Sequence, residues 1–224
     1  MITASQKTLT SIANSIAEYQ RVLILGCGTC VTVCMAGGEK EVGLLAEQIR
    51  LRERELPKEK RHAISEATIE RQCDVEFFDT VRPLIDDAEC VLSMACGVGV
   101  QHIVENFEGK IVLPALDTKF FGATEQPGVW VERCAGCGDC ILDKTGGICP
   151  VARCSKSLFN GPCGGSQDGV CEISDEVECV WQLIYDRQKE IGRLDDLMEM
   201  IDVKDWSTAR DGGPRKIVRE DATV

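Results

Sequence analysis

The chain has 224 residues, 14 of them cysteine, and 37 acidic residues against 25 basic ones give it a formal charge of −12. At roughly 150 residues per domain, this length allows one or two domains, whose cores are large enough to fold without disulfide or metal cross-links. The negative charge argues against binding to nucleic acid and to an anionic membrane surface, because both contacts depend on positive charge.

The first half of the sequence predicts alternating helices and strands. Apolar residues at helical spacing predict a helix from Leu9 to Ala17, and Arg21–Gly26 is a short apolar run typical of a strand buried on both faces. Further helices are predicted at 38–54, 77–85 and 98–107, and further strands at 88–94 and 110–114. Because such alternation favours a parallel sheet, residues 1–122 are predicted to form a small Rossmann-like or flavodoxin-like α/β domain.

The second half changes character near Phe121. The 46 residues from Cys134 to Cys179 contain eight cysteines and eight glycines, but only nine Leu, Ile, Val or Phe residues. That apolar share lies near the limit of about 20% below which burial no longer offsets conformational entropy, and small domains of this kind rely on metals or disulfides. We therefore predict a cysteine-rich, metal-folded domain over 123–201 that ends in a helix at 176–201. A tail over 202–224 is expected to fray or to lie on a partner.

The sequence also predicts where the protein resides. Its first ten residues are polar and lack the apolar stretch of a signal peptide, and no apolar run approaches the roughly 18 residues that span a bilayer. We therefore expect a cytoplasmic protein without membrane insertion. Because thiols in that compartment are kept reduced, the cysteines are predicted to be metal ligands or redox groups rather than disulfides.

The cysteines of the dense segment have the spacing of metal ligands. A C-x2-C-x2-C run starts at Cys134, as in bacterial ferredoxins that bind iron–sulfur clusters, and Cys149 precedes a proline and could ligate the other cluster. Eight thiolates would serve two four-thiolate sites. Zinc also binds four thiolates, so two clusters, one cluster with one zinc, and zinc alone all stay open. The candidate ligands are Cys134, Cys137, Cys140, Cys149, Cys154, Cys163, Cys171 and Cys179.

Cysteines also gather after two predicted strands of the first half. They follow the strands at 21–26 and 88–94, at the edge where open parallel sheets bind ligands, so a third cluster is expected there. Five cysteines compete for four positions, and a tight turn with buried thiols is the alternative. Cys90, inside an apolar strand, is predicted to be an inert core thiol. The candidate ligands are Cys27, Cys30, Cys34, Cys73 and Cys96, of which Cys73 competes with Cys96 for the fourth position.

The sequence offers many ligands and no evident catalytic machinery. It contains no phosphate-binding loop, no HExxH or G-x-S-x-G motif, and only two histidines. This pattern predicts an electron carrier or a scaffold protein with no catalytic site of its own. A thiol–disulfide enzyme that uses Cys27 with Cys30, or Cys134 with Cys137, is a further alternative, against which the many ligand-like neighbours argue.

Two stretches of the sequence resemble a known family. The run ERCAGCGDCILDKTGGICPVARCSKSLFNGPCGGSQDGVCEI, at 132–173, closely resembles the cysteine-rich C-terminal-domain family associated with methylenetetrahydrofolate reductase. The runs GCGTCVTVCMAGGEKEV, ERQCD and ACGVGVQ resemble the N-terminal part of the MetV-type small subunit. The similarity extends over about residues 20 to 195, which is most of the chain.

The resemblance implies a partnership. Members of this family accompany, or are fused to, a flavin-containing TIM-barrel subunit that reduces methylenetetrahydrofolate to methyltetrahydrofolate. It implies two to three [4Fe-4S] clusters, or zinc at one site, on the thirteen candidate cysteines, and it leaves flavin and folate to the partner. The clusters would relay low-potential electrons from a ferredoxin or another donor module. The alternative is a zinc-folded interaction subunit of the same complex that moves no electrons.

Overall fold

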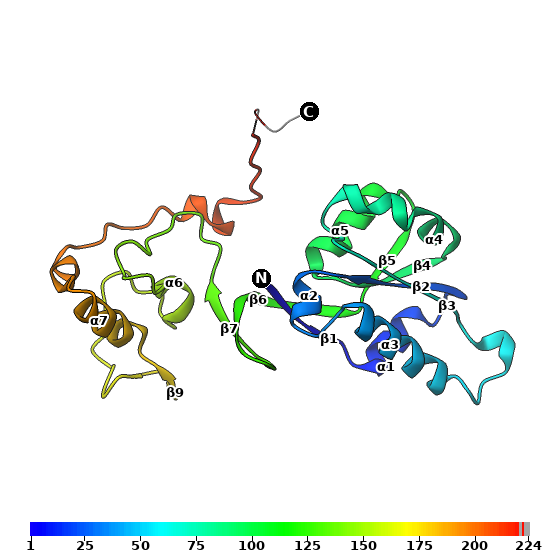
Figure 1. Ribbon diagram of the computed structural model, residues 1–224, viewed down its shortest axis with the longest axis horizontal. Helices are drawn as coiled ribbons and strands as arrows, with labels where there is room; N and C mark the ends of the chain where they lie inside the picture. The colour runs from blue at the N-terminus through cyan, green and yellow to red at the C-terminus, as the bar shows by residue number, and fades with distance from the viewer. Residues whose placement is uncertain (220, 222–224) are drawn as a thin grey trace. The chain divides into compact units, whose positions relative to one another are not determined.

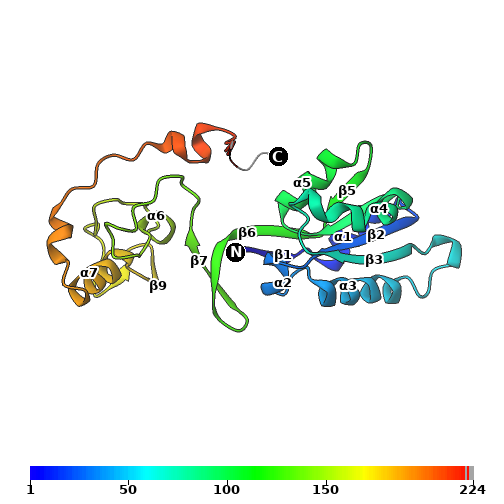
Figure 2. The same cartoon turned by 45° about the horizontal axis from the view of Figure 1, so that its top comes forward.

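The fold is described for residues 1–219 and 221 in a computed structural model (Figures 1 and 2). The chain divides into two compact units, one formed by Met1–Trp130 and a second that begins at Val131. Among the described residues, no helix combines the length and the apolar character that crossing a membrane requires. Each unit is described by itself below.

A parallel sheet of four strands forms the centre of the first unit. Its strands, in chain order, are β2 (Arg21–Cys27), β3 (Ala63–Ile69), β4 (Cys90–Met94) and β5 (Ile111–Pro114). They lie in the order β3-β2-β4-β5, and every neighbouring pair is parallel. Counted within this sheet, the order is second, first, third, fourth, as in flavodoxin-like folds. The predicted α/β class and parallel sheet are confirmed.

Helices cover both faces of this sheet (Figure 1). The helices are α1 (Leu9–Ile16) and α3 (Glu39–Arg52) on one face, and α4 (Arg82–Asp87) and α5 (Gly97–Asn106) on the other. Successive residues of β2 point to opposite faces, so Val22 and Ile24 join one buried cluster while Leu23 and Leu25 join the other. All four side chains are fully buried. This two-sided burial explains why the strand is apolar throughout.

A second sheet was not predicted from the sequence. It has the order β1-β6-β7 and consists of β1 (Ile2–Gln6), β6 (Leu116–Gln126) and β7 (Val129–Cys134). Strand β1 pairs antiparallel with β6, so that Ile2 lies opposite Phe121. These strands are only partly buried and carry many polar residues, so they lack the apolar runs of β2 and β4. Strand β3 of the parallel sheet, with the sequence AISEATI, also lacks such a run and was not predicted.

Two predicted helices differ from the observed elements. The segment 77–85 is divided between a 3-10 helix, η2 (Val75–Thr80), and α4, because Pro83 has no N–H to continue a helix and lies in the first turn of α4. The helix predicted at 176–201 is α7 (Val180–Glu190), which follows β9 (Ser174–Glu178). Gly192, with φ of +71°, ends it before the 3-10 helix η3 (Leu194–Met198).

The second unit has short elements and a small core. Besides β9 and α7 it contains α6 (Pro150–Arg153) and β8 (Val170–Cys171), and its core consists of Cys179, Val180, Trp181 and Ile184. Between residues 134 and 179, all of which are described, the buried residues are Ile141, Thr145, Pro150 and Cys179. The segment therefore gains little stability from burial, as its composition indicates.

The core position of Cys90 gives a first prediction. Its side chain is fully buried in β4, and burial raises the pKa of the thiol to about 11. At pH 8 only about a thousandth of this thiol is ionised, and only the thiolate is nucleophilic. We expect iodoacetamide to leave Cys90 unmodified in the folded protein and to modify it fully after denaturation, as read by peptide mass spectrometry. Equal labelling in both states would contradict the prediction.

Candidate metal centres

Cysteines stand at the carboxyl ends of three neighbouring strands in the first unit. Cys27 is the last residue of β2, and Cys30 begins the short helix α2 (Cys30–Val33). Cys73 follows β3, and Cys96 lies between β4 and α5. The central strands β2 and β4 form the point where the strand order reverses, and open α/β sheets bind ligands outside this point.

These four thiols, called the strand-end group (Cys27, Cys30, Cys73 and Cys96), influence one another electrostatically. Partial desolvation raises the pKa of the Cys73 thiol, and the negative charge of the other three thiolates raises it further. Cys27 and Cys96 are 7% and 8% exposed, whereas Cys73 is exposed. The group therefore extends from the sheet edge to the surface. Thiolates that repel one another in this way are stabilised by a cation between them.

Cys34, the fifth candidate of the first unit, is directed elsewhere. It is buried, and its thiol donates to the carbonyl oxygens of Ala4 and Val31, at 3.7 Å in each case. Burial is the main cause that raises the pKa of the Cys34 thiol, and the negative charge of the Cys30 thiolate raises it further. The structure thus brings both Cys73 and Cys96 to the sheet edge and turns Cys34 toward β1.

A buried glutamine, which the sequence analysis missed, holds the strand-end group in place. Gln72 is fully buried, and its Nε2 donates to the carbonyl oxygens of Leu25 (2.7 Å) and Gly26 (3.0 Å). Its Oε1 accepts a hydrogen bond from the Ser93 hydroxyl at 2.6 Å. Because Gln72 precedes Cys73, these bonds tie that cysteine to the ends of β2 and β4. Its position within the polar run ERQCD gave no signal of burial.

The first four cysteines of the dense segment, called the loop group (Cys134, Cys137, Cys140 and Cys149), line one hollow of about 320 Å³. Gly136 and Gly138 have φ of +62° and +83°, and the Gly136 N–H donates to Cys134 Sγ at 3.4 Å. Turns over 141–148, such as the bond from the Gly147 N–H to the Leu142 carbonyl, fold the chain back on itself. They bring Cys149 to the same hollow as the C-x2-C-x2-C run. Whether Cys149 ligates the other cluster, as the sequence allows, stays a prediction.

The remaining four cysteines, called the helix group (Cys154, Cys163, Cys171 and Cys179), line a second hollow. Its free space of about 20 Å³ corresponds to about one water molecule. Cys179 immediately precedes α7. Burial alone would raise the pKa of this thiol, but hydrogen bonds from the Ser166 hydroxyl and from the N–H groups of Gln182 and Trp181 lower it. The start of α7 therefore favours a thiolate at Cys179.

A charged pair lies beside the helix group. Lys156 and Glu172 form an ion pair, and Lys156 holds the pKa of the Glu172 carboxyl below its usual range. Cys163 Sγ lies 3.4 Å from the Glu172 carboxylate, to which its thiol donates. Cys171 Sγ lies 3.8 Å from the hydroxyl of Ser155. Together with Cys179, three thiols of this group therefore have polar partners within the chain.

The donor chemistry of the three groups fits thiolate-bound metal. All 14 cysteines are free thiols, and each group supplies four of them. Within residues 1–219 and 221, however, no three His, Cys, Asp or Glu side chains are close enough together to hold a single metal ion. Zinc–sulfur bonds of about 2.3 Å place four sulfurs about 3.8 Å apart. Binding one zinc would therefore draw the thiols inward, whereas a cluster accommodates a wider spacing.

Comparison with known proteins identifies part of the chain. Residues 113–207 match the family described as methylene-tetrahydrofolate reductase C terminal, and this range contains the loop group and the helix group. The resemblance stated from the sequence is thus confirmed for this range, which is consistent with a small subunit related to methylenetetrahydrofolate reductase. Searches of curated proteins and of solved structures found no match.

The buried network around Gln72 gives a second prediction. A Gln72→Leu substitution leaves the Ser93 hydroxyl and two strand carbonyls without their partner, so we expect the free energy of unfolding to fall by about 1–3 kcal/mol. Urea denaturation of the full chain measures this change. Gln101→Leu is the matched control, because Gln101 is exposed on α5 and bonds only within that helix. Equal stability of the two variants would contradict the assignment.

Proposed function

We propose that this protein is the iron–sulfur electron-transfer subunit of a cytoplasmic methylenetetrahydrofolate reductase complex. The observation that carries the proposal is the division of the eight dense-segment cysteines into two groups of four, each lining its own hollow. The match of residues 113–207 to a reductase-associated family supports the choice of complex. The strand-end group offers a third set of four thiols.

Thiolate-bound clusters would supply one-electron carriers. They would take electrons from a donor and pass them to the flavin of a TIM-barrel partner. The chain's own residues would set the conditions for this transfer. The Gly136 N–H, aimed at Cys134 Sγ, stabilises negative charge on sulfur, and so do the N–H groups at the start of α7 next to Cys179. Hydrogen bonds of this kind tune the reduction potential of a cluster.

Exposure indicates where electrons would enter and leave. Each of two groups combines cysteines that are partly covered with cysteines that are exposed, namely Cys73 in the strand-end group and Cys134 and Cys140 in the loop group. A donor or partner could approach these exposed cysteines closely. In this proposal the donor is a ferredoxin or another low-potential module, and the acceptor is the flavin-containing catalytic subunit that reduces methylenetetrahydrofolate.

A second candidate is favoured by the size of the helix-group hollow. Its free space of about 20 Å³ suits a single ion, whereas the loop-group hollow of about 320 Å³ has room for a larger group. Zinc at Cys154, Cys163, Cys171 and Cys179 would make this site structural. The protein would then carry electrons through the other two groups. If all three groups bound zinc, it would carry none.

Metal analysis tests the proposal. We expect anaerobically purified full-length protein to be brown, to contain iron and acid-labile sulfide in equal amounts, and to give a cluster EPR signal after reduction with dithionite. One equivalent of zinc beside the iron would assign the helix group to zinc. Colourless, iron-free protein that contains only zinc and supports full activity of the complex with ferredoxin would overturn the electron-transfer function.

Cysteine variants give a further prediction. The binding free energy of a thiolate-bound metal is folding free energy in a segment with so little burial. We therefore expect Cys137→Ser to remove the metal of the loop group and to make residues 134–149 sensitive to limited proteolysis. Cys90→Ser is the matched control and should retain the full metal content, since Cys90 lies in the core of β4. Full metal content in Cys137→Ser would contradict the assignment.

A further inference from the structure

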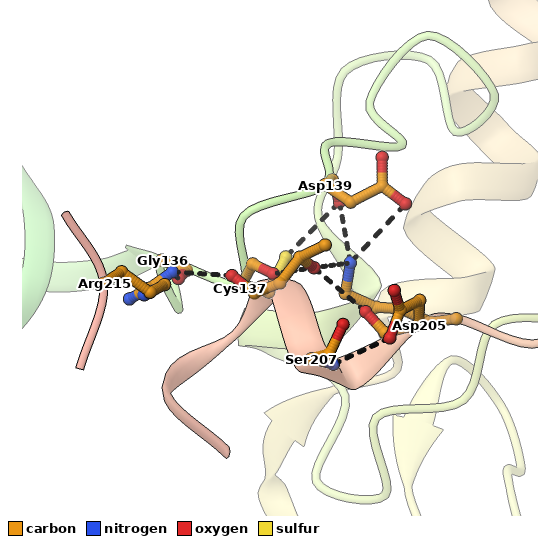
Figure 3. Close-up of polar contacts among 8 residues, drawn as sticks. Gly136, Cys137, Asp139, Asp205, Ser207 and Arg215 are labelled. Carbon is orange, nitrogen blue, oxygen red and sulfur yellow. Dashed lines mark hydrogen bonds and ion pairs between the residues drawn. The ribbon is translucent and has the colours of Figure 1, made fainter. Parts of the chain in front are cut away.

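The segment from Lys204 to Arg215, called the C-terminal strap, is bonded to the loop that carries the first three cysteines of the loop group (Figure 3). Lys204 Nζ donates to the Asp139 carbonyl at 3.2 Å, and Thr208 Oγ1 shares its proton between the carbonyls of Cys137 (3.0 Å) and Asp205 (2.9 Å). Arg215 Nη1 donates to the Gly136 carbonyl at 3.0 Å. The tail predicted to fray or to lie on a partner covers 202–224; its part from Lys204 to Arg215 bonds to its own unit, and residues 220 and 222–224 lie outside the described residues.

The strap is itself an ordered piece of chain. The Asp205 carboxylate accepts the Ser207 N–H at 2.8 Å and starts the 3-10 helix η4 (Trp206–Thr208). Arg215 Nη1 also donates to the Thr208 carbonyl at 2.9 Å, which folds the end of the strap back onto η4. The Trp206 ring packs edge-to-face on Phe159, with ring centres 6.0 Å apart. These contacts order the strap on the second unit.

The loop is shaped to receive the strap. A Cβ atom at Gly138, where φ is +83°, would lie 2.1 Å from the Thr208 carbonyl oxygen, so only glycine permits this approach. The Lys204 side chain is 1% exposed, and its ammonium also lies 3.7 Å from the Asp139 carboxylate. A cation so well covered is costly unless its partners are fixed, and here those partners belong to the cysteine loop.

The direction of these bonds matters for the thiols. The strap engages the carbonyl oxygens of Gly136, Cys137 and Asp139, which are the negative ends of the loop's peptide dipoles. On the same loop, the Gly136 N–H donates to Cys134 Sγ at 3.4 Å. The two cations, Lys204 and Arg215, add positive charge beside a loop that would carry thiolates.

We propose that Lys204, Thr208 and Arg215 are positioning residues that fix the Cys134–Cys140 loop in its ligand-binding conformation and raise the reduction potential of a cluster bound there. The first part concerns the chain alone. The second part rests on the proposed iron–sulfur function, because it requires a cluster in the loop group. Neither part requires the strap residues to touch the metal.

The first part is tested on the full-length protein as purified, with its metal content left unchanged. We expect Thr208→Val and Lys204→Met to speed amide hydrogen exchange over residues 135–140 about tenfold, because each variant removes an anchoring bond. Thr208→Ser keeps the hydroxyl and should restore wild-type exchange. Lys216→Met, which removes an exposed charge close to Arg215, is the matched control. Wild-type exchange in both Thr208→Val and Lys204→Met would overturn the positioning role.

The second part is tested on anaerobically purified protein. We expect Lys204→Met to lower the midpoint potential of one cluster in an EPR-monitored titration, and Thr208→Val to speed the loss of iron to a chelator. Faster hydrogen exchange in the loop, together with an unchanged midpoint potential and an unchanged rate of iron loss, would overturn only the proposed effect on the reduction potential. Wild-type protein without iron would overturn the proposed function, while the exchange experiment would still decide the positioning role.

Discussion

The shortage of buried side chains between residues 134 and 179 is the constraint on which the second unit depends. Four residues of this segment are buried, and its helices and strands are only two to five residues long. Burial on this scale cannot offset the conformational entropy of 46 ordered residues. In the proposed function, metal bound by thiols that gather in fours would supply the missing cross-links.

The first unit also carries cysteines, but its stability has another source. Its sheet has buried apolar clusters on both faces, so burial supplies here the stability that the second unit lacks. The parallel strands end together at one edge, where Gln72 joins β2, β4 and the segment before Cys73. A stable sheet that presents four thiols at its edge is suited to hold a redox group in a fixed position.

Much of this was predictable from the sequence, and what was not has physical causes. The apolar runs of β2 and β4 predicted a buried parallel sheet, and the eight cysteines of the dense segment predicted two four-thiolate sites. Strands β1, β3, β6 and β7 were missed because partly exposed strands do not need apolar residues at every position. The grouping of Cys149 depends on turns at 141–148, and the roles of Gln72 and Lys204 depend on contacts between residues far apart in the chain. Sequence spacing does not encode such contacts.

Hydrogen exchange on the full-length protein, compared before and after metal is stripped, tests the central claim most directly. Strands β2 and β4, with their fully buried apolar side chains, serve as the internal reference. The account predicts that amides between 134 and 179 lose most of their protection on metal removal while β2 and β4 keep theirs. Equal protection of residues 134–179 in both samples would show that this segment holds itself together, and it would contradict the account.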